Sequence, residues 1–303
     1  MRRIRCVVML ACTFGVLLAG PGCAVAPQEP ATTHTEFLRL RTADGRENAG
    51  LLHAPIGRTP RGGLVLIHGY GGNFYSGAQA HLSRQLTVHG FVTLATNMRD
   101  HDRGPKTTRF EDNRWDLQAA VDELTRRGVA PLVIIGESLG TNHVLYYLAA
   151  TRDQRIHATL LIAGPGNAFE WNVRQFGSAR ATRVLEEARG LRAVGRGKEL
   201  MVVDLGPLGK ALYSADHLVS LRGPQTKSDP YRNIAEVTVP ILLVYGTADR
   251  RVDVEVGRRL KAAATRTVRT DLVEIRGADH GFSRHRDALT ATVSRWLVEV
   301  LGR

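Results

Sequence analysis

The chain has 303 residues, a formal net charge of +12 and 43% hydrophobic residues. This apolar fraction excludes an intrinsically disordered chain, and the lack of an unbroken apolar run of about 18 residues excludes a polytopic membrane protein. The arginines are scattered and form no basic stripe with interleaved aromatic side chains, so no nucleic-acid partner is predicted.

The N-terminus has the layout of a secretory signal peptide, predicted over residues 1–23. Arginines at positions 2, 3 and 5 precede an apolar stretch over residues 6–19, and small residues follow it. All three cysteines lie within these 23 residues, so the rest of the chain has no disulfide, cysteine-based zinc site or cysteine nucleophile. An exported protein of the cell envelope or periplasm is therefore predicted.

Cys23 is predicted to carry a lipid that anchors the protein to a membrane. It ends the segment Leu-Leu-Ala-Gly-Pro-Gly-Cys, which resembles a bacterial lipoprotein signal, in which the cysteine is lipidated after cleavage. Gly20 and Pro21 stand where that pattern has a leucine and a small residue, so ordinary cleavage near residues 24–26 stays open. Residues 24–35 contain two prolines and lack apolar periodicity, and they are predicted to be a tether.

The folded domain is predicted over residues 36–302 as an α/β fold with a mostly parallel, doubly wound sheet. Short apolar runs bounded by Gly or Pro are typical of strands buried on both faces, and the longer amphipathic segments between them are typical of helices. After an antiparallel hairpin over 36–41 and 49–52, strands are predicted at 63–67, 91–95, 132–135, 158–163, 241–245 and 272–275, and helices at 76–89, 113–127, 139–151, 254–265 and 285–301.

One long segment interrupts this alternation where a short crossover is expected. Its length is too great for a bare loop, so a helical cap over about 165–237 is predicted, with helices at 178–192 and 207–221. The cap mixes apolar residues with arginines. Arg174 and Arg180 are substrate-binding candidates if they face the cleft, and the alternative is that they belong to a solvated surface.

The strongest chemical signal is Gly136-Glu137-Ser138-Leu139-Gly140, a G-x-S-x-G motif between a predicted strand and a predicted helix. The sharp turn at this junction pushes the serine hydroxyl into a cleft, and glycines at both ends avoid clashes with the neighbouring strand and helix. The helix N-terminus behind Ser138 favours developing negative charge. Ser138 is therefore predicted to be a nucleophile, with the backbone N–H of Leu139 as one donor to an oxyanion.

A serine nucleophile needs a base and an orienting acid, which follow it along the chain in the order acid, histidine in this kind of sheet. Asp249 and His280 each lie just after a predicted strand, at the sheet edge that also carries Ser138. They are predicted to be the acid and the base. Asp253, inside the following helix, and Asp279, next to the histidine, are rival acids that are less well placed to reach the far ring nitrogen.

A glycine-rich loop, His-Gly-Tyr-Gly-Gly, follows the first long strand and supplies the second oxyanion donor. Glycines let backbone amides approach a ligand, and the N–H of Tyr70 is the candidate. A phosphate-binding loop is disfavoured, because no Lys-Ser/Thr pair follows and the glycine spacing differs.

These segments together resemble the α/β-hydrolase family, over roughly residues 35–302. The resemblance is carried by the loop around Tyr70, the Gly-Glu-Ser-Leu-Gly elbow, the Gly-Thr-Ala-Asp-Arg-Arg-Val segment and the Ala-Asp-His-Gly-Phe segment. It implies the same site roles and a serine esterase- or lipase-like activity. It also implies a polar loop beside the site, in which His101 is a candidate substrate contact, with loop-stabilising hydrogen bonding as the alternative.

The sequence therefore predicts a serine hydrolase that cleaves a carboxylic ester, or a related acyl bond, of a small-molecule substrate through an acyl-enzyme. A thioesterase, a peptidase resembling prolyl oligopeptidases and a non-catalytic envelope binding protein stay open as alternatives. No metal or organic cofactor is implied, since His143 stands alone in the elbow helix and is predicted to be packed or partly exposed. No oligomeric state is predicted.

Overall fold

The computed structural model describes residues 32–206 and 209–302. The predicted signal peptide with Cys23, and the predicted tether up to residue 31, lie outside the described residues. The first described strand, β1 (Thr33–Arg41), begins inside the predicted tether, so regular structure starts earlier than the sequence indicated.

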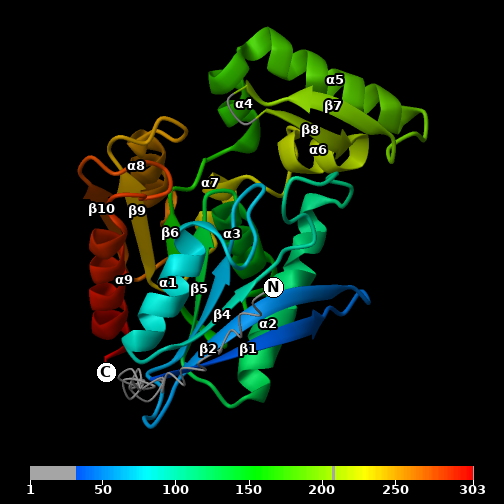
Figure 1. Ribbon diagram of the computed structural model, residues 1–303. Coiled ribbons are helices and arrows are strands. Elements are labelled where there is room, and N and C mark those ends of the chain that lie inside the picture. Colours follow the sequence, from blue (N-terminus) through cyan, green and yellow to red (C-terminus); the bar gives the residue numbers. More distant parts are fainter. Residues whose placement is uncertain (1–31, 207–208, 303) are drawn as a thin grey trace, which may run out of the picture. The chain divides into compact units, whose positions relative to one another are not determined.

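An eight-stranded sheet forms the centre of the described part of the chain (Figure 1). After β1 come β2 (Glu47–Pro55), β3 (Gly63–Ile67), β4 (Val92–Thr96), β5 (Leu132–Glu137), β6 (Ile156–Ile162), β9 (Ile241–Gly246) and β10 (Thr270–Ile275). Their order across the sheet is β1-β2-β4-β3-β5-β6-β9-β10. β2 is antiparallel to both β1 and β4, and all other neighbours run parallel. The predicted fold class, a mostly parallel α/β sheet with an antiparallel lead-in, is confirmed.

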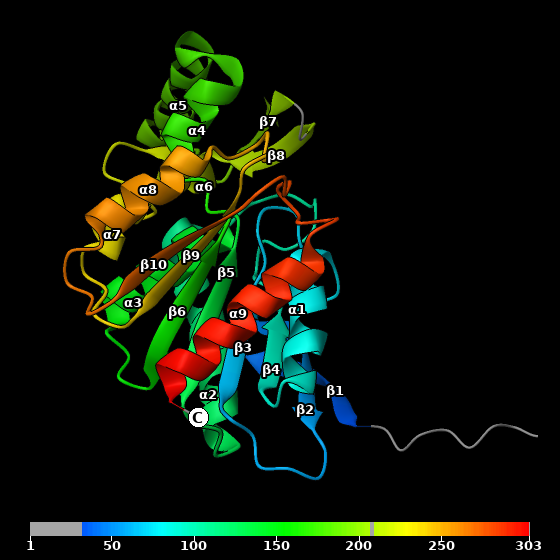
Figure 2. The same cartoon turned by 90° about the vertical axis from the view of Figure 1, so that its left-hand side faces the viewer.

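Helices cover both faces of this sheet (Figure 2). α1 (Gly77–Val88) and α9 (Arg286–Leu301) pack on one face, and α2 (Arg114–Arg126), α3 (Gly140–Thr151) and α8 (Val254–Ala263) pack on the other. Successive side chains of a strand point to opposite faces. In β3, Leu64 and Leu66 therefore join the core under α1 and α9, while Val65 and Ile67 join the core on the other face. No described helix is long and apolar enough to cross a membrane.

The segment between β6 and β9 forms a cap at the end of the sheet (Figure 1). It contains α4 (Ala168–Phe176), α5 (Ser178–Ala193), an antiparallel hairpin of β7 (Leu200–Asp204) and β8 (Lys210–Ser214), α6 (Ala215–Arg222) and α7 (Pro230–Ile234). The cap has helices as predicted, but it also contains a β-hairpin that the sequence did not indicate. The predicted helix over 207–221 is in part the strand β8, and helix begins only at Ala215. In the hairpin the buried side chains Met201, Val203, Ala211 and Tyr213 alternate with more exposed ones, which is the period of a strand.

Lys106 joins the cap to the loop that follows β4. Its backbone N–H donates to the carbonyl of Leu212 in β8, and its carbonyl accepts from the N–H of Ser214, both at 2.8 Å. Its buried ammonium donates to three backbone carbonyls, those of Asp100, His101 and Asp102. One residue thus ties the hairpin of the cap, through its backbone, to the polar loop beside the carboxyl end of the sheet, through its side chain.

Candidate active site

Ser138 lies in a strained turn between β5 and α3. Its φ is +52°, a left-handed conformation that is unusual for a serine. A Cβ atom added at Gly136 would lie 2.8 Å from the backbone of Gly140, and one added at Gly140 would lie 2.5 Å from the carbonyl oxygen of Ile67. Both glycines of the motif are therefore required by close backbone approach, as the sequence predicted. The N–H of Ser138 donates to the carbonyl of Ile162 at 2.8 Å, which fixes the turn to β6.

The structure brings Ser138, His280 and Asp249 together from three separate loops. The hydroxyl oxygen of Ser138 lies 3.1 Å from Nε2 of His280, and Nδ1 of His280 lies 2.7 Å from Oδ2 of Asp249. The Asp249 side chain is fully buried and the His280 side chain is 16% exposed. When Nδ1 donates its proton to the carboxylate, Nε2 keeps a lone pair and accepts the hydrogen bond from the serine hydroxyl.

Backbone amides hold the Asp249 carboxylate in place. Its other oxygen, Oδ1, accepts from the N–H groups of Arg251 at 2.7 Å and Val252 at 3.0 Å. The rival acids point elsewhere: Asp253 accepts from a backbone N–H at the start of α8, and Asp279 accepts from a backbone N–H in its own loop. Of the three carboxylates, only Asp249 is hydrogen-bonded to the imidazole of His280.

The loop after β3 passes directly beside the serine. A Cβ added at Gly69 would lie 2.6 Å from the Cβ of Ser138. Tyr70 follows Gly69 and, with Leu139, lines the cavity at the serine. The backbone N–H groups of Tyr70 and Leu139 donate no hydrogen bond to any described residue. Both amides are therefore available to an oxygen of a ligand, which is the property that an oxyanion site requires.

His68 anchors this loop, a role that the sequence analysis did not assign. Burial lowers the pKa of His68 to about 4, so its ring is neutral at physiological pH. Nδ1 then donates to the carbonyl of Gly69 at 2.8 Å, and Nε2 accepts from the N–H of Met98 at 2.9 Å. The neutral ring satisfies one acceptor and one donor, and it joins the loops after β3 and β4 beneath Tyr70.

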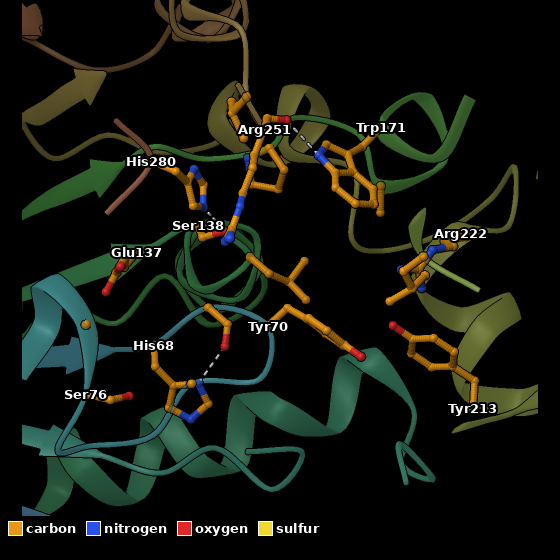
Figure 3. Close-up of a pocket in the computed structure, with 18 residues that line it drawn as sticks. His68, Tyr70, Ser76, Glu137, Ser138, Trp171, Tyr213, Arg222, Arg251 and His280 are labelled. Atoms are coloured by element: carbon orange, nitrogen blue, oxygen red, sulfur yellow. Dashed lines mark hydrogen bonds between the residues drawn. The ribbon is translucent and has the colours of Figure 1, made fainter. Parts of the chain in front are cut away.

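A cavity of about 160 Å³ opens at Ser138 between the sheet and the cap (Figure 3). The indole N–H of Trp171 in α4 donates to the carbonyl of Arg251 at 3.0 Å, which joins the cap to the loop that carries Asp249. The apolar and aromatic part of the lining comes from both layers and comprises Tyr70, Leu139, Pro165, Ala168, Trp171, Leu205, Tyr213 and Val252. Apart from its tyrosines, the ionisable side chains of the lining are His68, His280, Glu137, Arg222 and Arg251.

The three predicted substrate contacts lie outside this lining. Arg174 donates to a backbone carbonyl at the base of the cap, and Arg180 forms an ion pair with Asp204 at 3.1 Å. His101 forms a hydrogen bond with Asp102 at 2.7 Å, which is the loop-stabilising alternative. Each of the three has a partner on its own segment or in the cap, which agrees with the alternatives of a solvated surface for the two arginines and of loop stabilisation for His101.

Three residues that line the cavity were not predicted as site residues from the sequence: Glu137, Arg222 and Arg251. The Glu137 carboxylate accepts from the N–H of Gln79 at 3.1 Å, at the N-terminus of α1, and its burial raises its pKa. Arg251 belongs to the Gly-Thr-Ala-Asp-Arg-Arg-Val segment. Its position two residues after Asp249 is the sequence feature that could have indicated its place at the site. No sequence signal distinguishes Arg222 from the other arginines of the cap.

His143 packs in the core beside this site. Its ring stacks on Phe110 with centroids 4.7 Å apart, and burial lowers its pKa to about 3, so it is neutral. Within the described ranges, no group of three or more His, Cys, Asp or Glu side chains is placed to hold a metal ion.

The family model described as serine aminopeptidase, S33, matches residues 58–287. No protein with curated functional information matches.

Three solved structures are similar in fold. Est1E from Butyrivibrio proteoclasticus with bound ferulic acid is 18% identical, with a TM-score of 0.66, and covers 88% of this chain and 100% of its own. The esterase domain of a Rhodothermus marinus protein is 23% identical, with a TM-score of 0.61 and coverages of 87% and 97%. An esterase from Pyrococcus furiosus is 17% identical, with a TM-score of 0.63 and coverages of 88% and 93%.

Proposed function

The chain belongs to the family of serine hydrolases described as serine aminopeptidase, S33, with the α/β-hydrolase fold, and on this premise we propose that it is an exported enzyme that cleaves a carboxylic ester. The reaction uses Ser138 as nucleophile, His280 as general base and acid, and Asp249 as orienting acid. The observation that carries this proposal is the pair of hydrogen bonds, 3.1 and 2.7 Å long, that joins these three side chains in the order which acyl transfer needs.

In the first half of the reaction, Nε2 of His280 accepts the Ser138 hydroxyl proton while the serine oxygen attacks the ester carbonyl carbon. The carbonyl oxygen becomes an oxyanion that accepts hydrogen bonds from the N–H groups of Tyr70 and Leu139. The bond to the leaving alcohol then breaks, and the alcohol oxygen takes the proton from His280. An acyl-enzyme and a free alcohol result.

In the second half, water gives a proton to Nε2 of His280 and attacks the acyl carbon. The second tetrahedral intermediate collapses, the bond to the Ser138 oxygen breaks, and that oxygen takes the proton back. The carboxylic acid leaves and the resting enzyme is restored. Through both halves Asp249 keeps the Nδ1 proton of His280 in place and stabilises the imidazolium that forms.

Two features favour an ester over a peptide N-terminus, although the family description names an aminopeptidase. Two of the compared structures of this fold are described as esterases. An aminopeptidase also needs a negative group to receive the substrate ammonium. Apart from Asp249, the carboxylate at the cavity is Glu137, which the N-terminus of α1 already engages, and two arginines add positive charge there.

A fluorophosphonate probe tests the proposal, because it reacts covalently only with an activated serine. We expect the purified wild-type protein to be labelled and the Ser138→Ala variant and heat-unfolded wild type to stay unlabelled. A panel of p-nitrophenyl esters, a thioester and an aminoacyl p-nitroanilide then ranks the scissile bonds, with the esters expected to be fastest. Equal labelling of Ser138→Ala, or a folded wild-type protein that takes no label, contradicts the assignment.

We also propose that the protein is exported and anchored through a lipid on Cys23. The support is the sequence pattern of residues 1–23, in which Cys23 follows the apolar stretch and is the last of the chain's three cysteines. Expression in a bacterium fed with radiolabelled palmitate is expected to label the wild-type protein and not Cys23→Ala, and wild type alone is expected to sediment with membranes. Incorporation of palmitate that survives the Cys23→Ala change contradicts the anchor.

A further inference from the structure

Arg222, the last residue of α6, is a buried arginine that has no hydrogen bond or ion pair within the described part of the chain. It is 7% exposed, and its Nε and Nη1 atoms have no hydrogen-bond partner. No carboxylate among residues 32–206 and 209–302 forms an ion pair with it. The same chain neutralises another buried guanidinium, that of Arg99, with two carboxylates, Asp44 and Asp116. Arg222 has nothing equivalent.

The unpartnered groups of Arg222 lie in the proposed active-site cavity, across from the serine. Figure 3 shows Ser138 and His280 on one side of the cavity, Arg222 and Tyr213 on the other, and Tyr70 between them. The guanidinium carbon lies 5.0 Å from the centroid of the Tyr213 ring. The hydroxyl of Tyr213 is also buried, and the Tyr70 hydroxyl points toward it from the middle of the cavity (Figure 3). A guanidinium with unsatisfied donors and a tyrosine hydroxyl thus meet at one end of the cavity.

Burying a charge or a hydroxyl without a partner destabilises a protein. Stacking on the Tyr213 ring offsets only part of this cost, because it leaves the N–H groups unsatisfied. The matching ligand is an anion with two oxygens in one plane, since a guanidinium binds a carboxylate through two parallel hydrogen bonds. Arg251, on the opposite side of the same cavity, adds a second positive charge that favours an anionic ligand.

We propose that Arg222 and Tyr213 form a carboxylate-binding subsite, and that the substrate is an ester that carries a free carboxylate, such as a monoester of a short dicarboxylic acid. This inference rests on the proposed ester hydrolysis at Ser138. The carboxylate of the substrate binds at Arg222 while its ester carbonyl lies at Ser138, under the amides of Tyr70 and Leu139. The length of the acyl chain between the two groups is then set by the span of the cavity.

The test compares anionic esters with neutral esters in two arms, the first of which keeps the leaving group constant. The p-nitrophenyl monoesters of succinic, glutaric and adipic acid are paired with p-nitrophenyl butyrate, valerate and hexanoate. A second arm pairs 4-carboxyphenyl butyrate with phenyl butyrate, which places the carboxylate on the alcohol side. The readout is the ratio of kcat/KM for the anionic ester to kcat/KM for the neutral ester, and wild type is expected to favour the anionic ester in one arm.

In Arg222→Met this ratio is expected to fall about 10- to 100-fold, the range expected for losing hydrogen bonds to a charged group. Tyr213→Phe, which removes only the hydroxyl, is expected to lower the ratio about 3- to 10-fold. If Arg222→Met does not fold, this second variant still tests the proposal. Arg189→Met is the matched control, because Arg189 lies on the cap, pairs with Glu186 and is not part of the cavity lining. It should leave the ratio at the wild-type value. An unchanged ratio in both Arg222→Met and Tyr213→Phe overturns the subsite.

Binding without turnover separates this inference from the proposed reaction. Monomethyl glutarate is titrated calorimetrically into Ser138→Ala and into Ser138→Ala combined with Arg222→Met, with methyl valerate as the neutral ligand. We expect the second variant to bind the monoester at least about tenfold more weakly. If wild type hydrolyses no ester but this difference is found, the subsite stands and the reaction is wrong. If esters are hydrolysed and the monoester binds both variants equally, the reaction stands and the subsite is wrong.

Discussion

Replacing Ser138 by alanine is expected to lower kcat for ester hydrolysis by about 10⁵- to 10⁶-fold, the loss that follows removal of the nucleophile in a serine hydrolase. Stability should change by less than about 1 kcal/mol, because among residues 32–206 and 209–302 the hydroxyl forms a hydrogen bond with His280 alone. Alanine is also no worse than serine at the φ of +52°, since both carry a Cβ and neither side chain relieves the turn.

Steady-state rates with a p-nitrophenyl ester and thermal unfolding of the same samples measure both expectations. Ser76→Ala is the matched control: it removes another hydroxyl from the cavity lining, outside the hydrogen-bonded triad. We expect this variant to keep activity within about tenfold of wild type. Residual activity of Ser138→Ala above about one thousandth of wild type, in samples free of contaminating esterase, contradicts the nucleophile assignment.

The sheet was predictable from the sequence because its strands are buried on both faces. Val65 and Leu66 point to opposite sides, yet both contact helices, so the strand is an unbroken apolar run that differs clearly from its surroundings. The elbow was predictable for a related reason. Gly136 and Gly140 have no room for a side chain, and this backbone constraint leaves a local signature around Ser138.

The cap was less predictable because each of its elements buries only one side against a small core. The hairpin strands β7 and β8 are short, and their exposed positions still hold apolar residues such as Val202 and Leu212. This hides the alternation of inward and outward side chains that distinguishes a strand from a helix. The sequence therefore indicated a helix over 207–221, where Tyr213 instead faces the cap core from β8, which pairs with β7.

The charged groups of the cavity were not predictable, because their positions depend on how distant segments dock. Arg174 and Arg180 were candidate substrate contacts only because they are arginines of the cap. In the structure, Arg174 lies near Glu170 of the same helix and Arg180 forms an ion pair with Asp204 of β7. Arg222 reaches the cavity only because α6 ends beside the Tyr213 ring and the cap lies over the sheet edge. Side-chain direction of this kind is set by tertiary packing, which leaves no local pattern in the sequence.

Replacing Asp249 by asparagine is expected to lower kcat by about 10⁴-fold while leaving the fold intact. The two backbone N–H groups of Arg251 and Val252 hold one carboxylate oxygen as an acceptor, and the asparagine carbonyl oxygen takes that position. The side-chain NH₂ then faces His280 and donates to Nδ1. The imidazole proton moves to Nε2, which now donates toward Ser138 and no longer accepts the serine proton. The geometry at Asp249 therefore dictates the inactive tautomer.

Asp253→Asn and Asp279→Asn are the matched controls for this change, because both remove one negative charge from the same region and both carboxylates accept from backbone N–H groups. Neither side chain is hydrogen-bonded to His280, so each should keep kcat within about tenfold of wild type. Rates with a p-nitrophenyl ester across pH 5 to 9 distinguish the three variants. A loss in Asp253→Asn or Asp279→Asn as large as that in Asp249→Asn places the orienting acid elsewhere, since a carboxylate without contact to the imidazole has no means of selecting its tautomer.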